Sequence, residues 1–111
     1  MSNTGVQARR SAVFLLDQIL GEEPRLMSEL LAGGALDKLP PDDRARAQRL
    51  ATQTLRGLER ADRLLQKHLN KQPPLTVQNV LRVGTIELCQ GGAAHGVVNT
   101  MVNLVSQHRT L

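Results

Sequence analysis

The segment DRARAQRLATQTLRGLERADRLLQKHL, from Asp43 to Leu69, carries the most regular pattern in the chain. Apolar and small side chains recur in it at the three- and four-residue spacing of an amphipathic helix. The inward positions are Ala47, Leu50, Ala51, Thr54, Leu55, Leu58, Ala61, Leu65 and Leu69. This periodicity predicts a long helix, with Gly57 as the position at which it would divide into two.

Cations follow the opposite side of the same segment. At about 100° per residue, a helix that is continuous or only slightly bent aligns six of them in one row. They are Arg49, Arg56, Arg60, Arg63, Lys67 and Lys71. Residues 44–71 hold eight cations against two anions, whereas residues 1–55 are balanced at seven of each. The net charge of +4 therefore belongs to the second half of the chain.

Such a basic row has two interpretations. It is either the solvated face of an amphipathic helix or a surface that holds a polyanion. A solvated face usually mixes both signs of charge, so the shortage of acidic residues favours the polyanion. Arginine also binds phosphate with two parallel hydrogen bonds. Because Phe14 is the only aromatic residue, base stacking is not expected, and we predict recognition of backbone and shape.

The remaining sequence also predicts an all-α protein. A length of 111 residues suits one domain over 1–111, and 41% hydrophobic residues with 1% aromatic ones indicate an aliphatic core between helices. Four further helices are expected. The first is Val6–Leu20, ended by Gly21, and the second is a short helix after Pro24, with Leu26, Leu30 and Leu31 inward, ended by Gly33-Gly34. The third follows Pro73-Pro74, and the fourth is Val97–Gln107, with Val98, Met101, Val102 and Val105 inward.

Capping and packing signals refine these expectations. Asp42 or Asp43 is an N-cap candidate for the central segment, and Thr76 for the helix after Pro74. That helix would bury one face made of Val77, Val80, Leu81, Gly84 and Leu88. Because glycine costs a helix interior about 1 kcal/mol relative to alanine, Gly84 predicts the close approach of a neighbouring helix.

Several kinds of chemistry have no matching pattern. GGAAHG at Gly91–Gly96 lacks the spacing of a phosphate-binding loop, and His68, His95 and His108 have no partners at metal-ligand spacing. Cys89 is interpreted as a small hydrophobe in an apolar helix. No catalytic, cofactor or metal site is therefore expected. A lone cysteine and the absence of an apolar run near 20 residues predict a cytoplasmic protein without a membrane partner.

Three motifs together carry a family resemblance. They are the Arg9-Arg10 pair, the segment Asp43–Leu69, and VLRVGTIELCQGGAAHGVVNTMVNLVSQ at Val80–Gln107. From Ala8 to about Gln107 the chain resembles the NusB-like RNA-binding domain family. TLR at Thr54–Arg56 and AHGVVN at Ala94–Asn99 are most similar to the N-terminal domain of the bacterial rRNA cytosine-C5 methyltransferase RsmB/Sun (Fmu), with the antitermination factor NusB as second choice.

The resemblance implies a NusB-like bundle of about six helices, here without the family's closing helix. It implies that the chain is no enzyme, holds no cofactor, and helps position rRNA for an S-adenosylmethionine-dependent catalytic domain that it does not contain. The chain would be an N-terminal fragment of that enzyme, or a short protein that has lost it. The predicted RNA-binding residues are Arg9, Arg10, Arg49, Arg56, Arg60, Arg63 and Lys67.

Further partners and roles remain open at this point. The groove left by the closing helix is a candidate surface for a homodimer. The alternatives to an RNA-positioning module are a free-standing NusB-type antitermination factor and a protein-docking helical domain without direct RNA contact.

Overall fold

The described part of the chain contains five continuous helices. The computed structural model describes residues 4–69, 71–91, 97, 100, 101 and 104. The helices are α1 (Thr4–Leu20), α2 (Met27–Ala32), α3 (Pro41–Arg56), α4 (Leu58–Gln66) and α5 (Leu75–Cys89). Val97, Thr100, Met101 and Leu104 are also helical. The described part contains no strand, which confirms the all-α prediction, and none of its helices is long and apolar enough to span a membrane.

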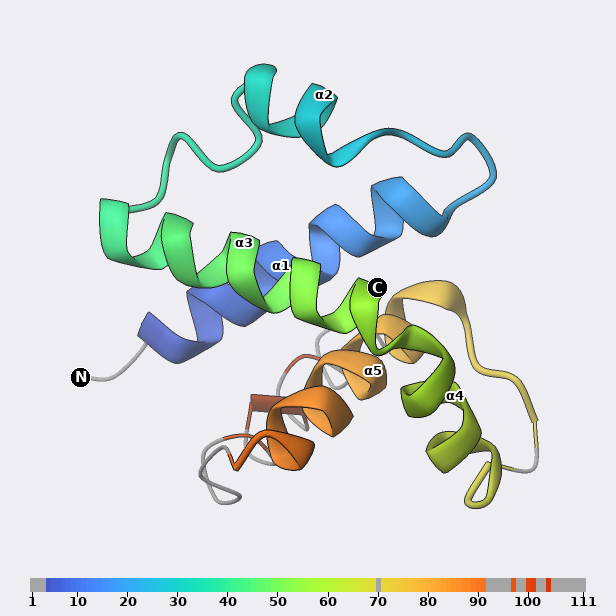
Figure 1. The fold of residues 1–111 in the computed structure, drawn as a ribbon. Helices are drawn as coiled ribbons and strands as arrows, with labels where there is room; N and C mark the ends of the chain where they lie inside the picture. The colour runs from blue at the N-terminus through green and yellow to red at the C-terminus, as the bar shows by residue number, and fades with distance from the viewer. Residues whose placement is uncertain (1–3, 70, 92–96, 98–99, 102–103, 105–111) are drawn as a thin grey trace.

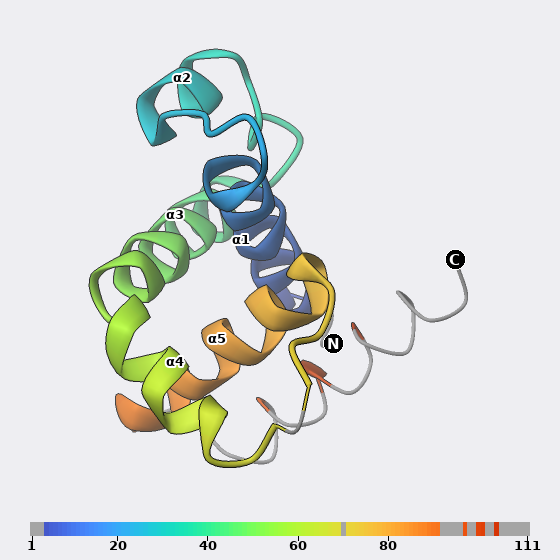
Figure 2. The same ribbon diagram turned by 90° about the vertical axis from the view of Figure 1, so that its right-hand side faces the viewer.

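α1 is the central element of the arrangement (Figures 1 and 2). α3 lies across it, α2 covers it on one side, and α5 packs against it from the other. α4 turns away from the end of α3 and lies beside α5. α2, α3 and α5 thus surround α1, and α4 is held to the bundle by its contacts with α3 and α5.

The buried side of α1 is made of aliphatic residues. Ala8, Ala12, Leu15 and Leu16 are completely buried, and the alanines let neighbouring helices approach closely. The same core cluster includes side chains from every other helix except α4: Leu30, Ala47, Leu50, Ala51, Val80 and Val83. At roughly 25 cal/mol per Å² of buried apolar area, this shared cluster is the main source of stability.

Proline and glycine set most of the helix ends. α1 stops at Leu20 before Gly21, and α2 stops at Ala32, followed by Gly33 and by Gly34 at φ +89°. The expected cap at Asp42 or Asp43 is wrong, because the N-cap of α3 is Pro40 and the helix starts at Pro41. Both aspartates lie in the first turn, where their negative charge interacts favourably with the positive end of the helix dipole.

The expected cap at Thr76 is also wrong. α5 starts at Leu75 after Pro74, so Thr76 already lies in its first turn. Its hydroxyl donates a hydrogen bond to Asp17 Oδ2 of α1 at 2.8 Å. Thr76, which the sequence predicted as a helix cap, therefore makes a tertiary contact instead.

The central segment divides at Gly57. The backbone there departs from helical geometry, with φ −102° and ψ 19°, and α4 leaves α3 in a new direction (Figure 1). A Cβ at this position would lie 2.6 Å from Ile86 Cδ1 of α5. The absent side chain lets α5 pack into the corner between α3 and α4. The segment therefore forms two helices and not one continuous or slightly bent helix.

Three leucines expected to face inward are exposed. Leu26 is 65% exposed, Leu88 is 40% exposed, and Leu69 lies beyond the end of α4 at 36%. Cys89, interpreted as a small buried hydrophobe, is exposed at the end of α5. In place of Leu88, the buried face of α5 includes Asn79, as well as other polar side chains described below.

Gly84 marks a close helix contact, as predicted. A Cβ built there would collide with the side chain of Met101, whose segment crosses α5 at this point. Val97 and Leu104 of the same segment are buried, and Met101 packs against the core. The other predicted inward residues, Val98, Val102 and Val105, lie outside the described residues.

Gly84→Ala should destabilise the protein by about 1–3 kcal/mol in urea unfolding, because the added methyl group overpacks the contact with Met101. In a Met101→Ala background the same change should be neutral or stabilising, since the collision is gone and alanine favours the helix. Equal losses in both backgrounds would contradict a collision at Met101.

Candidate nucleic-acid interface

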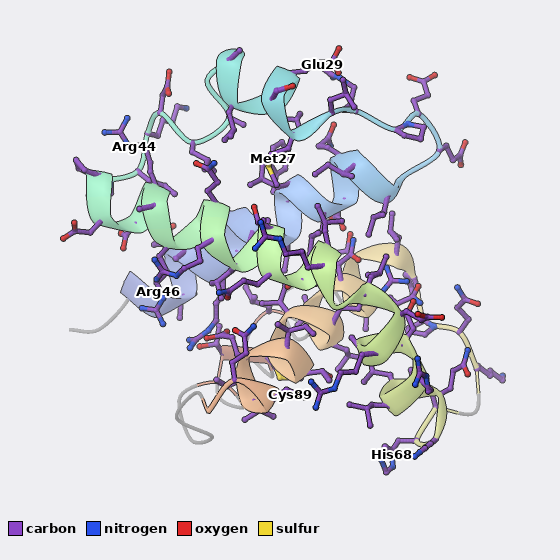
Figure 3. All side chains as sticks on the ribbon, viewed as in Figure 1. Met27, Glu29, Arg44, Arg46, His68 and Cys89 are labelled. Atoms are coloured by element: carbon purple, nitrogen blue, oxygen red, sulfur yellow. The ribbon has the colours of Figure 1, made fainter. Side chains whose placement is uncertain are left out.

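The first row of cations lies on α3. Arg49 and Arg56 are seven residues apart, which is close to two helical turns, so they share one face of the helix. Both are exposed. Arg44 and Arg46, nearer the start of α3, are partly buried and point outward from different sides of the helix (Figure 3).

The second row lies on α4. Arg60 and Arg63 are exposed, and Lys67 follows at the C-cap with helical dihedral angles of −67° and −18°. Arg63 Nη2 lies 3.8 Å from Glu59 Oε1, but the two side chains are 67% and 92% exposed. An ion pair so open to water contributes little, so Arg63 remains available to a polyanion.

The break at Gly57 separates the two rows. Arg56 is the last residue of α3, and Arg60 lies in the first turn of α4, so the rows meet at the corner between the helices. Arg49 and Lys67 extend away from that corner along different axes. The predicted straight row is therefore replaced by two shorter rows, each with its own helical register.

The two acidic residues of this segment have different partners, since Glu59 lies near Arg63 and Asp62 is bound by a residue of α5. Asp62, one of the two anions in the segment, accepts two hydrogen bonds from the buried Arg82, at 2.7 and 2.9 Å. Within the described part of the chain, no ion pair involves Arg49, Arg56, Arg60 or Lys67. No carboxylate at ion-pair distance therefore compensates the charge of these four residues in the described part.

Arg9 occupies a different environment. It is only 9% exposed, and its guanidinium donates to Glu87 Oε1 at 2.6 Å and to Oε2 at 3.1 Å. A third bond, to Thr100 Oγ1, has a length of 2.8 Å. This buried pair joins α1 to α5 and to the segment of Thr100, so Arg9 is committed to the interior. Its neighbour Arg10 is exposed on α1.

A second polar network joins α1, α4 and α5. Asn79 donates to Asp17 Oδ1 at 2.7 Å and accepts from Arg82 Nη1 at 2.8 Å. Arg82 then reaches Asp62, and Thr76 binds the other oxygen of Asp17. Every buried side-chain nitrogen and oxygen atom in the described part has a partner.

Asn79, Arg82 and Glu87 had no predicted role. Their signal was present, because these three residues and Gln78 are strongly polar positions among the apolar residues of α5. A buried polar residue needs a partner, and the partners lie at distant positions in the sequence that helical periodicity does not identify.

The other candidate groups supply no site. Among the described residues no cluster of three or more histidine, cysteine or acidic side chains could hold a metal ion. His68 is exposed beyond α4, while His95 and His108 lie outside the described residues. Of GGAAHG, only Gly91 is described, with φ +84°.

The sequence matches one known protein family. A family model described as the NusB family matches residues 6–110. The chain belongs to the NusB family. A NusB domain is a non-catalytic RNA-binding fold, and membership suggests a role in RNA binding or antitermination. No curated protein and no solved structure matches the sequence of this NusB domain.

The ion pair inside the NusB domain can be tested by a double-mutant cycle. Arg9→Met should cost about 3–5 kcal/mol in urea unfolding, because it leaves the Glu87 carboxylate buried without its cation. Arg9→Met/Glu87→Met should recover much of that loss. Arg60→Met, the same change at an exposed position, should stay within about 0.5 kcal/mol of the parent. A similar small effect for Arg9→Met would contradict the buried pair.

Proposed function

We propose that residues 1–111 form a single NusB-like domain that binds RNA through the cations of α3 and α4. The observation that supports this most is that Arg49, Arg56 and Arg60 are exposed without an ion pair in the described part, while Asp62 is neutralised internally. These arginines are not among the buried residues of the core. Their charge is available to phosphates.

The physical basis is the release of counterions. Each phosphate neutralised by a cation frees bound salt ions, so affinity falls as the salt concentration rises. Arginine adds a planar pair of donors that matches two phosphate oxygens. The corner at Gly57 places the two rows along different directions, which suits a bent or folded RNA better than a straight strand.

The RNA-binding set is narrower than the sequence suggested. Arg49, Arg56, Arg60, Arg63 and Lys67 are retained because they are exposed, and Arg10 is retained as an exposed residue of α1. We leave out Arg9, because RNA contact would require its bonds to Glu87 and Thr100 to break.

We further propose that the domain positions rRNA for an S-adenosylmethionine-dependent cytosine-C5 methyltransferase domain. The support is the similarity of Thr54–Arg56 and Ala94–Asn99 to the N-terminal domain of that enzyme, RsmB or Sun. The catalytic domain would be the protein partner and would hold the cofactor. A homodimer through the groove left by the missing closing helix remains a prediction.

A role as a free-standing antitermination factor is the second candidate, and family membership favours it equally. A complex with the small-subunit ribosomal protein partner of NusB would support that role. Acceleration of rRNA methylation when the domain is added to the separate catalytic domain would support the first.

Arg56→Glu/Arg60→Glu/Arg63→Glu should weaken binding to an rRNA fragment on the order of 100-fold or more at physiological salt, since it converts three phosphate contacts into repulsions. Fluorescence anisotropy measures the affinity, and circular dichroism should show unchanged helicity. Arg60→Gln alone should reduce the slope of log K against log salt concentration by about 0.7–1.

Arg25→Gln is the matched control, because it also removes one exposed positive charge but lies in the connection before α2, outside both rows of α3 and α4. Its salt slope should equal that of the parent. Equal effects of Arg25→Gln and Arg60→Gln would show that only the net charge matters. Binding that survives the triple change would overturn the proposed surface and favour a protein-docking domain.

A further inference from the structure

A pocket of about 320 Å³ opens between the end of α4 and the start of α5. Leu65, Leu69 and Pro73 form its aliphatic part. Arg82 is its most buried lining residue, held by Asp62 and Asn79. The volume is at the lower end of the range for small-ligand sites, which combine an apolar wall with a few polar groups.

Three glutamines supply those polar groups. They are Gln66 of α4, Gln72 of the connection and Gln78 of α5. The side chain of Gln66 makes no hydrogen bond within the described part. The side-chain amide of Gln72 donates to that of Gln78 over 3.4 Å, which is long for a hydrogen bond, and this contact is exposed. Each amide carries both donors and an acceptor, so it can pair with the edge of a nucleobase through two bonds.

The charge around the pocket favours a nucleotide over a basic peptide. Its one carboxylate, Asp62, is neutralised by Arg82, and Lys71 contributes a positive charge to the lining. The lining positions of α4 follow one helical face, and Arg63 and Lys67 lie about 100° further around the helix than the lining residues Asp62 and Gln66. Lys71 is the lysine of the lining itself, so it would accompany the phosphate of a base inside the pocket, while Arg63 and Lys67 would contact RNA that continues around α4.

We infer that this pocket binds one unstacked base of the RNA held by α3 and α4. The inference rests on the proposed RNA-binding function and deepens it, because it adds a base contact to a surface of phosphate contacts. No aromatic residue lines the pocket, so the base is held by amide hydrogen bonds and by aliphatic contact. Such a contact gives the domain a sequence preference that its cations alone do not supply.

Binding of short single-stranded RNA tests the inference. The probes are four homopolymers and one abasic oligonucleotide with the same number of phosphates, titrated by anisotropy at several salt concentrations. The parent domain should bind one homopolymer roughly 5–100-fold more tightly than the abasic probe, as expected for a bidentate base contact. Gln66→Ala and Gln78→Ala should each reduce that preference without changing the salt slope, because neither residue is charged.

Two controls separate the base contact from the phosphate surface. Gln90→Ala removes an exposed amide at the opposite end of α5 and should leave both preference and slope unchanged. Arg60→Gln should lower the slope and keep the base preference. Circular dichroism checks that each variant keeps its helicity.

Equal affinity of the parent for the abasic probe and all homopolymers would overturn the pocket while leaving the phosphate surface in place. A preference that survives in both glutamine variants would do the same. If those variants instead weaken only the complex with the methyltransferase catalytic domain, the pocket is a protein-docking site and the base contact is wrong. Absence of any RNA binding would overturn the proposed function itself.

Discussion

The buried charges of α5 are the constraint on which the structure depends. Glu87 and Arg82 lie on the packed side of this helix, and removal of a charge from water is unfavourable unless a partner replaces the solvent. Arg9 supplies the partner for Glu87, and Asp62 supplies it for Arg82. These pairs connect α5 to α1 and α4, so the position of α5 is specified by directional bonds as well as by the aliphatic core.

The same constraint divides the cations into two groups. Interior cations are held by carboxylates at hydrogen-bond distance, as Arg82 is by Asp62. Outer cations such as Arg56 and Arg60 are exposed and make no ion pair with a carboxylate in the described part. Because Arg82 binds both oxygens of Asp62, the pair offsets the negative charge of an aspartate that is still 32% exposed on α4. A change at Asp62 would therefore affect both the buried pair and the charge available to the proposed RNA.

The candidate site was only partly predictable. Helical spacing correctly assigned Arg49, Arg56, Arg60, Arg63 and Lys67 to the solvent side. It could not show that Arg9 is buried, because Arg9 and Arg10 are adjacent and only the rotation of α1 in the bundle decides which of them faces Glu87. The pocket glutamines were not predicted either, since they come from two helices and a connection that lie side by side only after folding.

What the sequence alone determined was local: an all-α chain, helix ends at Gly21 and Gly33, a tight contact at Gly84, and a basic side opposite an apolar side. Periodicity, glycine geometry and charge distribution are sufficient for these features because they depend on residues a few positions apart. The tertiary structure decided the corner at Gly57, where Ile86 occupies the space of a side chain, and the partners of the buried charges. Both depend on residues distant in sequence that meet only in the packed core.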